Sequence, residues 1–267
     1  MQHYSEHVLL QSDDPSNAPI GFMISASEEH KSTPQSMWRC LGFSITSHSS
    51  NYITTITMPS ALNILTSKAA NVLACAFMHY PLMDYVFQGE SDAAQRRKLQ
   101  ILFCCCAKAA LLYGGVAQTD DLDGVLLWLP GPNASLGFWR ELQCGMLALP
   151  FQLGVAQTLR LSQDESILQY ILQHANVNQM GLIWQVGVHP KSQGKGYLRI
   201  LMDRAIDDMK RQGMTEFWLM TDTPINVKRY ERLGFAVVYS NPVQSSAYSF
   251  WVMRKLLVTF ALCAGPV

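Results

Sequence analysis

The stretch from Leu182 to Tyr197 constrains the fold of this chain more than any other. It begins as a β-branched apolar run, stops at Pro190, and continues through a polar turn, Gln193-Gly194-Lys195-Gly196, into a long helical pattern. It therefore predicts a strand, a glycine turn and a helix start. Several backbone N–H groups at such a start lack intrahelical partners and lie at the positive end of the helix dipole. Glycine admits a phosphate close to the backbone and Lys195 adds positive charge, so the turn is a candidate anion site.

Composition limits the classes of partner. Lys+Arg and Asp+Glu are both 20, so no net field attracts nucleic acid or an anionic membrane, and we expect a small-molecule partner. The seven cysteines form no CxxC pair, which argues against a zinc site. No apolar stretch has the form of a signal peptide or the length of a membrane span, which favours a cytoplasmic protein.

The chain divides into three parts by composition. Residues 1–50 are polar and without sustained period, and we predict a disordered extension. A β-branched run at residues 52–57 predicts a first strand and the start of a folded domain that spans residues 51–255. Residues 256–267 form a short apolar tail.

Within the domain, apolar periodicity predicts helices and strands in alternation. Helices are expected near 60–77, 92–113, 165–174, 196–212 and 226–232, with short broken helices in 135–157, and Asp222 to Pro224 is expected to cap the helix that follows. Strands are expected at 116–119, 124–130, 182–188, 217–220, 235–239 and 249–253. The crossover from residue 182 to residue 220 predicts a parallel pair, so the fold class is α/β with a mixed sheet.

Two motifs carry a family resemblance. The loop Gln193 to Gly196, together with Asn226-Val227-Lys228-Arg229-Tyr230-Glu231-Arg232-Leu233-Gly234-Phe235, resembles the GNAT superfamily of acyl-CoA-dependent N-acyltransferases, nearest to the puromycin N-acetyltransferase-like branch. The resemblance covers about residues 52–255. It implies a mostly antiparallel central sheet flanked by helices, with a parallel strand pair that splays at the acyl-CoA site.

The resemblance also implies an activity. Acetyl-CoA would be the co-substrate, with no metal, and its acetyl group would pass to a primary amine of a small molecule or peptide by direct attack in a ternary complex. A homodimer is compatible with this reading. The alternative is a degenerate member that binds an acyl-CoA or a partner without turnover.

The resemblance also assigns roles to single residues, according to their positions in the two motifs. Tyr230 matches the general acid that protonates the leaving thiolate, and Asn226 matches the residue that holds the pantetheine arm. The remaining cofactor-binding candidates are the strand edge Val186, Gly187 and Val188 and the cradle Gln193, Gly194, Lys195, Gly196, Tyr197 and Leu198. We expect Gly187 to allow close approach of another backbone.

The sequence departs from the family pattern at two positions. Leu198 stands where the family loop has a small residue, and this leucine is expected to crowd the pyrophosphate. Gln185 stands where relatives often carry a strand glutamate, and a glutamine cannot take a proton. Asp84, His79 or ordered water then remain as candidates for the general base.

The resemblance places the broken helices over the acceptor pocket. Their aromatic and sulfur side chains either line this pocket or are buried in the core: Phe138, Trp139, Met146 and Phe151.

Overall fold

The computed structural model describes residues 23–25, 44–46, 53–57, 60–162, 165–241 and 249–257. The chain divides into two compact units, Met1–Leu65 and Thr66–Val267. The extension predicted for residues 1–50 and the tail predicted for residues 256–267 lie mostly outside the described residues, so both stay predictions.

The first unit contains a small antiparallel sheet. Its strands are β1 (Met23–Ser25), β2 (Ser44–Thr46) and β3 (Ile53–Thr57), in the order β1-β3-β2. The strand expected at residues 52–57 is therefore present as β3. It pairs with β1 and β2, and the central sheet begins later in the chain.

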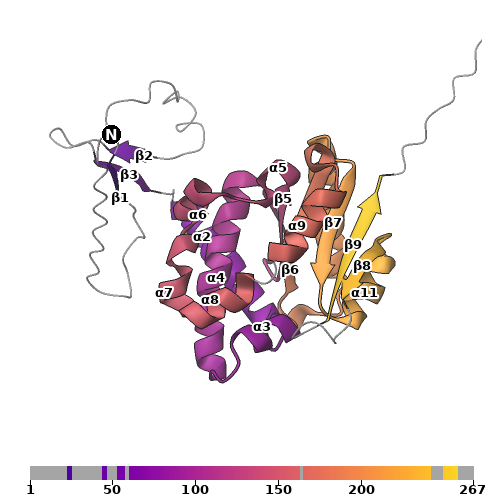
Figure 1. Ribbon diagram of the computed structural model, residues 1–267, viewed down its shortest axis with the longest axis horizontal. Helices are drawn as coiled ribbons and strands as arrows, with labels where there is room; N and C mark the ends of the chain where they lie inside the picture. Colours follow the sequence, from indigo (N-terminus) through magenta and orange to yellow (C-terminus); the bar gives the residue numbers. More distant parts are fainter. Residues whose placement is uncertain are drawn as a thin grey trace, which may run out of the picture. The chain divides into compact units, whose positions relative to one another are not determined.

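The second unit is built on a six-stranded mixed sheet of order β4-β5-β6-β7-β9-β8 (Figure 1). The strands are β4 (Gly115–Gln118), β5 (Gly124–Pro130), β6 (Met180–Val188), β7 (Glu216–Thr221), β8 (Ala236–Asn241) and β9 (Phe250–Leu256). Only the β6–β7 pair is parallel among the strands described for this sheet. The expected mixed, mostly antiparallel sheet is thus confirmed.

Helices cover both faces of this sheet. They are α2 (Ser60–Ala76), α3 (Pro81–Val86), α4 (Asp92–Tyr113), α5 (Gly131–Ala134), α6 (Phe138–Cys144), α7 (Leu149–Leu153), α8 (Val155–Leu161), α9 (Glu165–His174), α10 (Tyr197–Arg211) and α11 (Pro224–Glu231), with 3-10 turns η1 (Met146–Ala148), η3 (Val177–Gln179) and η4 (Pro190–Ser192). The expected breaks between α6 and α8 occur at Gly145 and Gly154, both of which have positive φ. Figure 1 shows α4, α7 and α8 grouped together, with α11 beside β8.

Two hydrophobic cores form because strand side chains alternate between the faces of the sheet. Leu127 of β5 and Leu182 of β6 pack with α2, α4 and α9 in one core. Leu126 of β5 and Ile183 of β6 pack with α10 in the other. Burying one such leucine or isoleucine contributes about 1.5–3 kcal/mol, so both faces of the sheet are firmly covered. None of the helices described is both long and apolar enough to cross a bilayer.

Candidate acyl-CoA site

The central strands separate at one end of the sheet. β6 and β7 pair in parallel between Met180–Ile183 and Glu216–Leu219, while β6 runs on to Val188. The register between β5 and β6 shifts at this point: Leu127 pairs with Gln185 and Trp128 with Ile183, which leaves Trp184 as an extra residue in β6. Such a bulge bends its strand. The splayed parallel pair expected from the family resemblance is therefore present, and the β6 edge beyond Ile183 is not paired with β7.

A cavity of about 1,070 Å³ lies at this opening. Apart from Lys195, the site residues predicted from the sequence all line it: Val186, Gly187, Val188, Gln193, Gly194, Gly196, Tyr197, Leu198, Asn226 and Tyr230. The volume is close to the upper end of the range for small-molecule and cofactor sites. The sequence motifs, which lie on a strand, a loop and two helices, therefore meet in one space.

The glycine turn before α10 has the geometry of an open anion cradle. Gly194 and Gly196 have φ of 81° and 79°, and a Cβ at either position would meet nothing within 4 Å. Helix α10 begins without a side-chain cap, and its Arg199 N–H bonds to the Gly196 carbonyl over 3.0 Å, so the N–H groups before Arg199 are the ones available to a ligand. The turn and the helix start are where the sequence placed them.

The acidic β4–β5 turn holds this cradle in place. The Tyr197 hydroxyl donates to Asp121 over 3.0 Å, and the Ser192 hydroxyl donates to Asp123. The backbone N–H of His189 also donates to the Asp123 carbonyl over 2.7 Å. The pKa of Tyr197 is raised, first because its hydroxyl donates to the Asp121 carboxylate. This role of the turn was not predicted from the sequence, because the turn and the cradle are far apart in the chain.

Gly187 on the β6 edge and Leu198 in the cradle have neighbours that the sequence did not reveal. A Cβ at Gly187 would lie 2.8 Å from Ala76 Cβ and 3.0 Å from Leu73 Cδ2, both on α2. The backbone close to Gly187 on this side is that of α2, whose Leu73 Cα would lie 3.6 Å from the added Cβ. Leu198 is half-buried, packs against the core under α10 and also lines the cavity.

Tyr230 lies in the core under α11 and on the cavity wall. Its side chain is buried, with its ring centroid 6.1 Å from that of Phe235. Burial raises the pKa of Tyr230 well above its ordinary value. The hydroxyl therefore stays protonated at neutral pH, as a proton donor must.

A second tyrosine, Tyr80, meets the end of β7 inside the same cavity. Its hydroxyl lies 3.1 Å from Thr221 Oγ1, and it accepts long hydrogen bonds from the Asp222 N–H (3.4 Å) and from Asn226 Nδ2 (3.5 Å). Burial and then the charge of Asp222 raise the pKa of Tyr80 to about 12. Sequence reasoning did not single out Tyr80, because its polar partners lie some 140 positions later in the chain.

Asp222 joins this cluster. The predicted capping segment, Asp222 to Pro224, does begin α11, with Thr223 as its N-cap residue and Pro224 in its first turn, but no side chain caps this helix. The Asp222 side chain serves α3 instead, because its Oδ2 accepts the Leu82 N–H over 2.8 Å at the start of that helix. Its Oδ1 is buried with no hydrogen-bond partner among the described residues, and burial raises the pKa of its carboxyl group.

The other acceptor-side candidates lie elsewhere. His79 Nδ1 lies 3.6 Å from Asp84 Oδ1, both side chains are at least half exposed, and neither residue lines the cavity. Phe138, Trp139 and Phe151 are exposed as well, whereas the fourth broken-helix candidate, Met146, lines the cavity.

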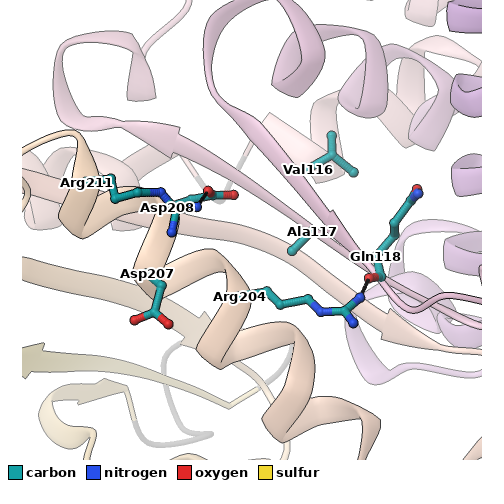
Figure 2. Close-up of a pocket in the computed structure, with 7 residues that line it drawn as sticks. All are labelled: Val116, Ala117, Gln118, Arg204, Asp207, Asp208 and Arg211. Atoms are coloured by element: carbon teal, nitrogen blue, oxygen red, sulfur yellow. Dashed lines mark hydrogen bonds and ion pairs between the residues drawn. The ribbon is translucent and has the colours of Figure 1, made fainter.

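A smaller hollow of about 360 Å³ lies between β4 and α10 (Figure 2). Arg204 donates to the Gln118 carbonyl, and Arg211 pairs with Asp208. Asp207 pairs with Lys210 on the same helix. These charged side chains already have partners, so the hollow offers a ligand little unsatisfied charge. No cluster of three metal-ligating side chains occurs among the residues that the structure describes.

The sequence has recognisable relatives. Residues 166–238 match the family model described as acetyltransferase (GNAT) domain. An uncharacterized N-acetyltransferase of Schizosaccharomyces pombe is 27% identical over 174 residues, which are 63% of this chain and 69% of that protein.

Two solved structures are also similar. One is a putative acetyltransferase from Salmonella typhimurium with its cofactor acetyl-CoA (25% identity, TM-score 0.29, 32% of this chain and 52% of that chain). The other is nourseothricin acetyltransferase (20% identity, TM-score 0.28, 31% of this chain and 52% of that chain). The matches thus span about half the length of each solved relative. Residues 166–238 of this chain are thus similar to an acetyltransferase (GNAT) domain, and the mixed α/β fold is consistent with that family.

Proposed function

We propose that the protein transfers an acetyl group from acetyl-CoA to a primary amine of a small molecule or peptide, by direct attack in a ternary complex. The observation that carries this proposal is the single cavity at the β6–β7 splay. It joins an unpaired strand edge, an uncapped helix start and a buried tyrosine. An acyl-CoA needs these three things: partners for its amide-rich arm, a cradle for its pyrophosphate and a proton donor for its thiolate.

Each part has a role in the proposed reaction. The pantetheine arm would pair with Val186–Val188, and the pyrophosphate would lie against Gln193–Leu198, with Lys195 adding charge beside it. Asn226 would hold the arm, and a β6 N–H would stabilise the tetrahedral oxyanion. As the nitrogen–carbon bond forms and the carbon–sulfur bond breaks, Tyr230 would give its proton to the sulfur.

The cavity wall also describes the acceptor. On the side of α2, α4 and the broken helices, the lining is mainly apolar and includes Phe77, Leu102, Met146 and Leu149. Trp184 of β6 adds an aromatic ring. Such a wall favours an amine carried on an apolar or aromatic body. The puromycin N-acetyltransferase-like branch suggested by the sequence stays a prediction.

Thiol release tests the proposal. The protein would be incubated with acetyl-CoA and a panel of primary amines and peptides that includes 2-phenylethylamine, with mass detection of acetylated products. We expect CoA formation that depends on the acceptor.

The rival is a binding module without turnover, favoured by Gln185 at the family's glutamate position and by Leu198 in the cradle. Acetyl-CoA binding without product would support this rival. No binding at all would contradict both.

A further inference from the structure

The Tyr80–Asp222 cluster contains an unsatisfied carboxylate oxygen at the reaction centre. Asp222 is 6% exposed, lines the cavity and follows β7 where it has parted from β6. One of its oxygens caps α3, and the other has no partner among the described residues. A buried acceptor left without a donor carries an uncompensated desolvation cost. Such a cost in a cavity wall points to a ligand or a proton that satisfies the oxygen in the working state.

Tyr80 connects this carboxylate to the cavity. Its oxygen already accepts from two donors, the Asp222 N–H and Asn226 Nδ2, so its own hydrogen is left to donate to Thr221 or to the Asp222 carboxylate. Both accepted bonds are long. An amine in the cavity can replace the weaker one, from Asn226, and hydrogen-bond directly to the phenolic oxygen.

We propose that Tyr80 is the group that takes the proton from the acceptor amine, and that Asp222 receives the Tyr80 proton in turn. This inference rests on the proposed acetyl transfer. The amine lone pair bonds to the acetyl carbon, and the carbon–sulfur electron pair leaves on sulfur, which is protonated by Tyr230. The nitrogen then gives a proton to the Tyr80 oxygen while the Tyr80 hydroxyl proton passes to the Asp222 carboxylate. Water finally takes that proton from Asp222 and returns one to Tyr230.

Other proton acceptors fit less well. Gln185 lines the cavity but has no basic atom. His79 and Asp84 lie close to each other, at least half exposed, and do not line the cavity. Glu141 lines the cavity but belongs to α6, whereas Asp222 directly follows β7, the strand that borders the opening. Asp222 is therefore the carboxylate at the splay.

The electrostatic surroundings suit this role. Titratable groups around Asp222 come from the turn before α3 and from α11, and they are Tyr80 and Tyr230, with Arg229 beside Tyr230. Burial raises the pKa of Asp222 above its ordinary value, which makes it a stronger base than an exposed aspartate. Both tyrosines have raised pKa values and stay neutral. Among these groups, Asp222 is the one whose ordinary pKa lies below neutral pH.

The same shift fixes the sign of a stability effect. The folded protein holds the Asp222 proton more tightly than the unfolded chain, so stability falls as pH rises from the ordinary pKa through the raised one. Asp222→Asn removes this slope and keeps an oxygen to cap α3. If Asp222 served only to cap α3, Asp222→Asn would be no more stable than the wild type at neutral pH.

The experiment compares Asp222→Asn, Tyr80→Phe and the rival carboxylate variant Asp84→Asn in the full chain. The substrate is the best acceptor from the amine panel, and an aniline-type acceptor that stays neutral above pH 6 separates enzyme ionisation from substrate ionisation. We expect kcat to fall about 10²-fold in Asp222→Asn and Tyr80→Phe and to hold in Asp84→Asn. The acetyl-CoA Kd should be unchanged in all three. The acidic limb of the kcat profile should vanish in Asp222→Asn, and its melting temperature at pH 7 should be above that of wild type.

The inference would be overturned if Asp222→Asn turned over as fast as the wild type, or if its kcat profile kept the acidic limb. It would also be overturned if the variant lost activity together with a lower melting temperature and weaker acetyl-CoA binding. Absence of turnover by the wild type with every acceptor would instead overturn the proposed function, and this inference with it.

Discussion

The two sides of the cavity are built in different ways. The cofactor side comes from one continuous part of the chain, β6 through α11, whose turns and helix starts are local features. The acceptor side is assembled over distance: Tyr80 meets Thr221 across 141 positions, and Leu82 meets Asp222 across 140. A local motif builds the cofactor side, which hydrogen bonds to the β4–β5 turn then hold in place, whereas the acceptor geometry depends on how α3 docks against the sheet. The two sides should therefore respond differently to substitution.

Tyr230→Phe should give the largest loss on the cofactor side. It keeps the ring in the core and removes the proton donor, so turnover should fall by roughly 10²-fold with the acetyl-CoA Kd little changed. Steady-state kinetics and equilibrium binding measure the two effects separately. Unchanged turnover would leave Tyr230 as a packing residue and move the search for the acid elsewhere in the cavity.

Gly187→Ala tests the contact between the two sides. The added methyl group would lie 2.8 Å from Ala76 Cβ, and overpacking of this kind costs about 1–3 kcal/mol. Urea unfolding should show the loss. Gly194→Ala is the matched control: its Cβ meets open space but its φ of 81° is strained, so we expect a loss of about 1 kcal/mol there. Wild-type stability in Gly187→Ala, beside a loss in Gly194→Ala, would mean that α2 does not constrain Gly187.

Leu198→Ala should give the smallest effect, on binding alone. The leucine lines the cavity at the helix start, so shortening it should tighten acetyl-CoA binding a few-fold. Because Leu198 is also half-buried, unfolding should become easier by roughly 1 kcal/mol. Isothermal titration would measure the binding change. Unaltered affinity would show that the leucine does not crowd the pyrophosphate.

The same difference between local features and long-range contacts explains which parts of the fold and the site could be predicted from the sequence. Periodicity fixed α4 and α10 to within a residue or two, and the glycine turn located the cradle. The role of Asp222 was missed, because a residue after a strand reads as a cap for the next helix until α3 is seen against it. Gly187 was assigned to the site, but its close neighbour, α2, lies more than a hundred positions earlier. Sequence reasoning here reached the parts of the site whose partners are near in the chain.

Backbone hydrogen exchange with and without acetyl-CoA tests the central claim most directly, since it reports where the cofactor binds without needing the acceptor. If acetyl-CoA occupies the β6–β7 opening, amides of residues 186–188 and 194–198 should gain protection. Amides of β4 and α10 around Arg204 and Arg211, at the smaller hollow, should not change. Protection at the smaller hollow, or none at residues 186–188 and 194–198 despite measurable binding, would contradict the account.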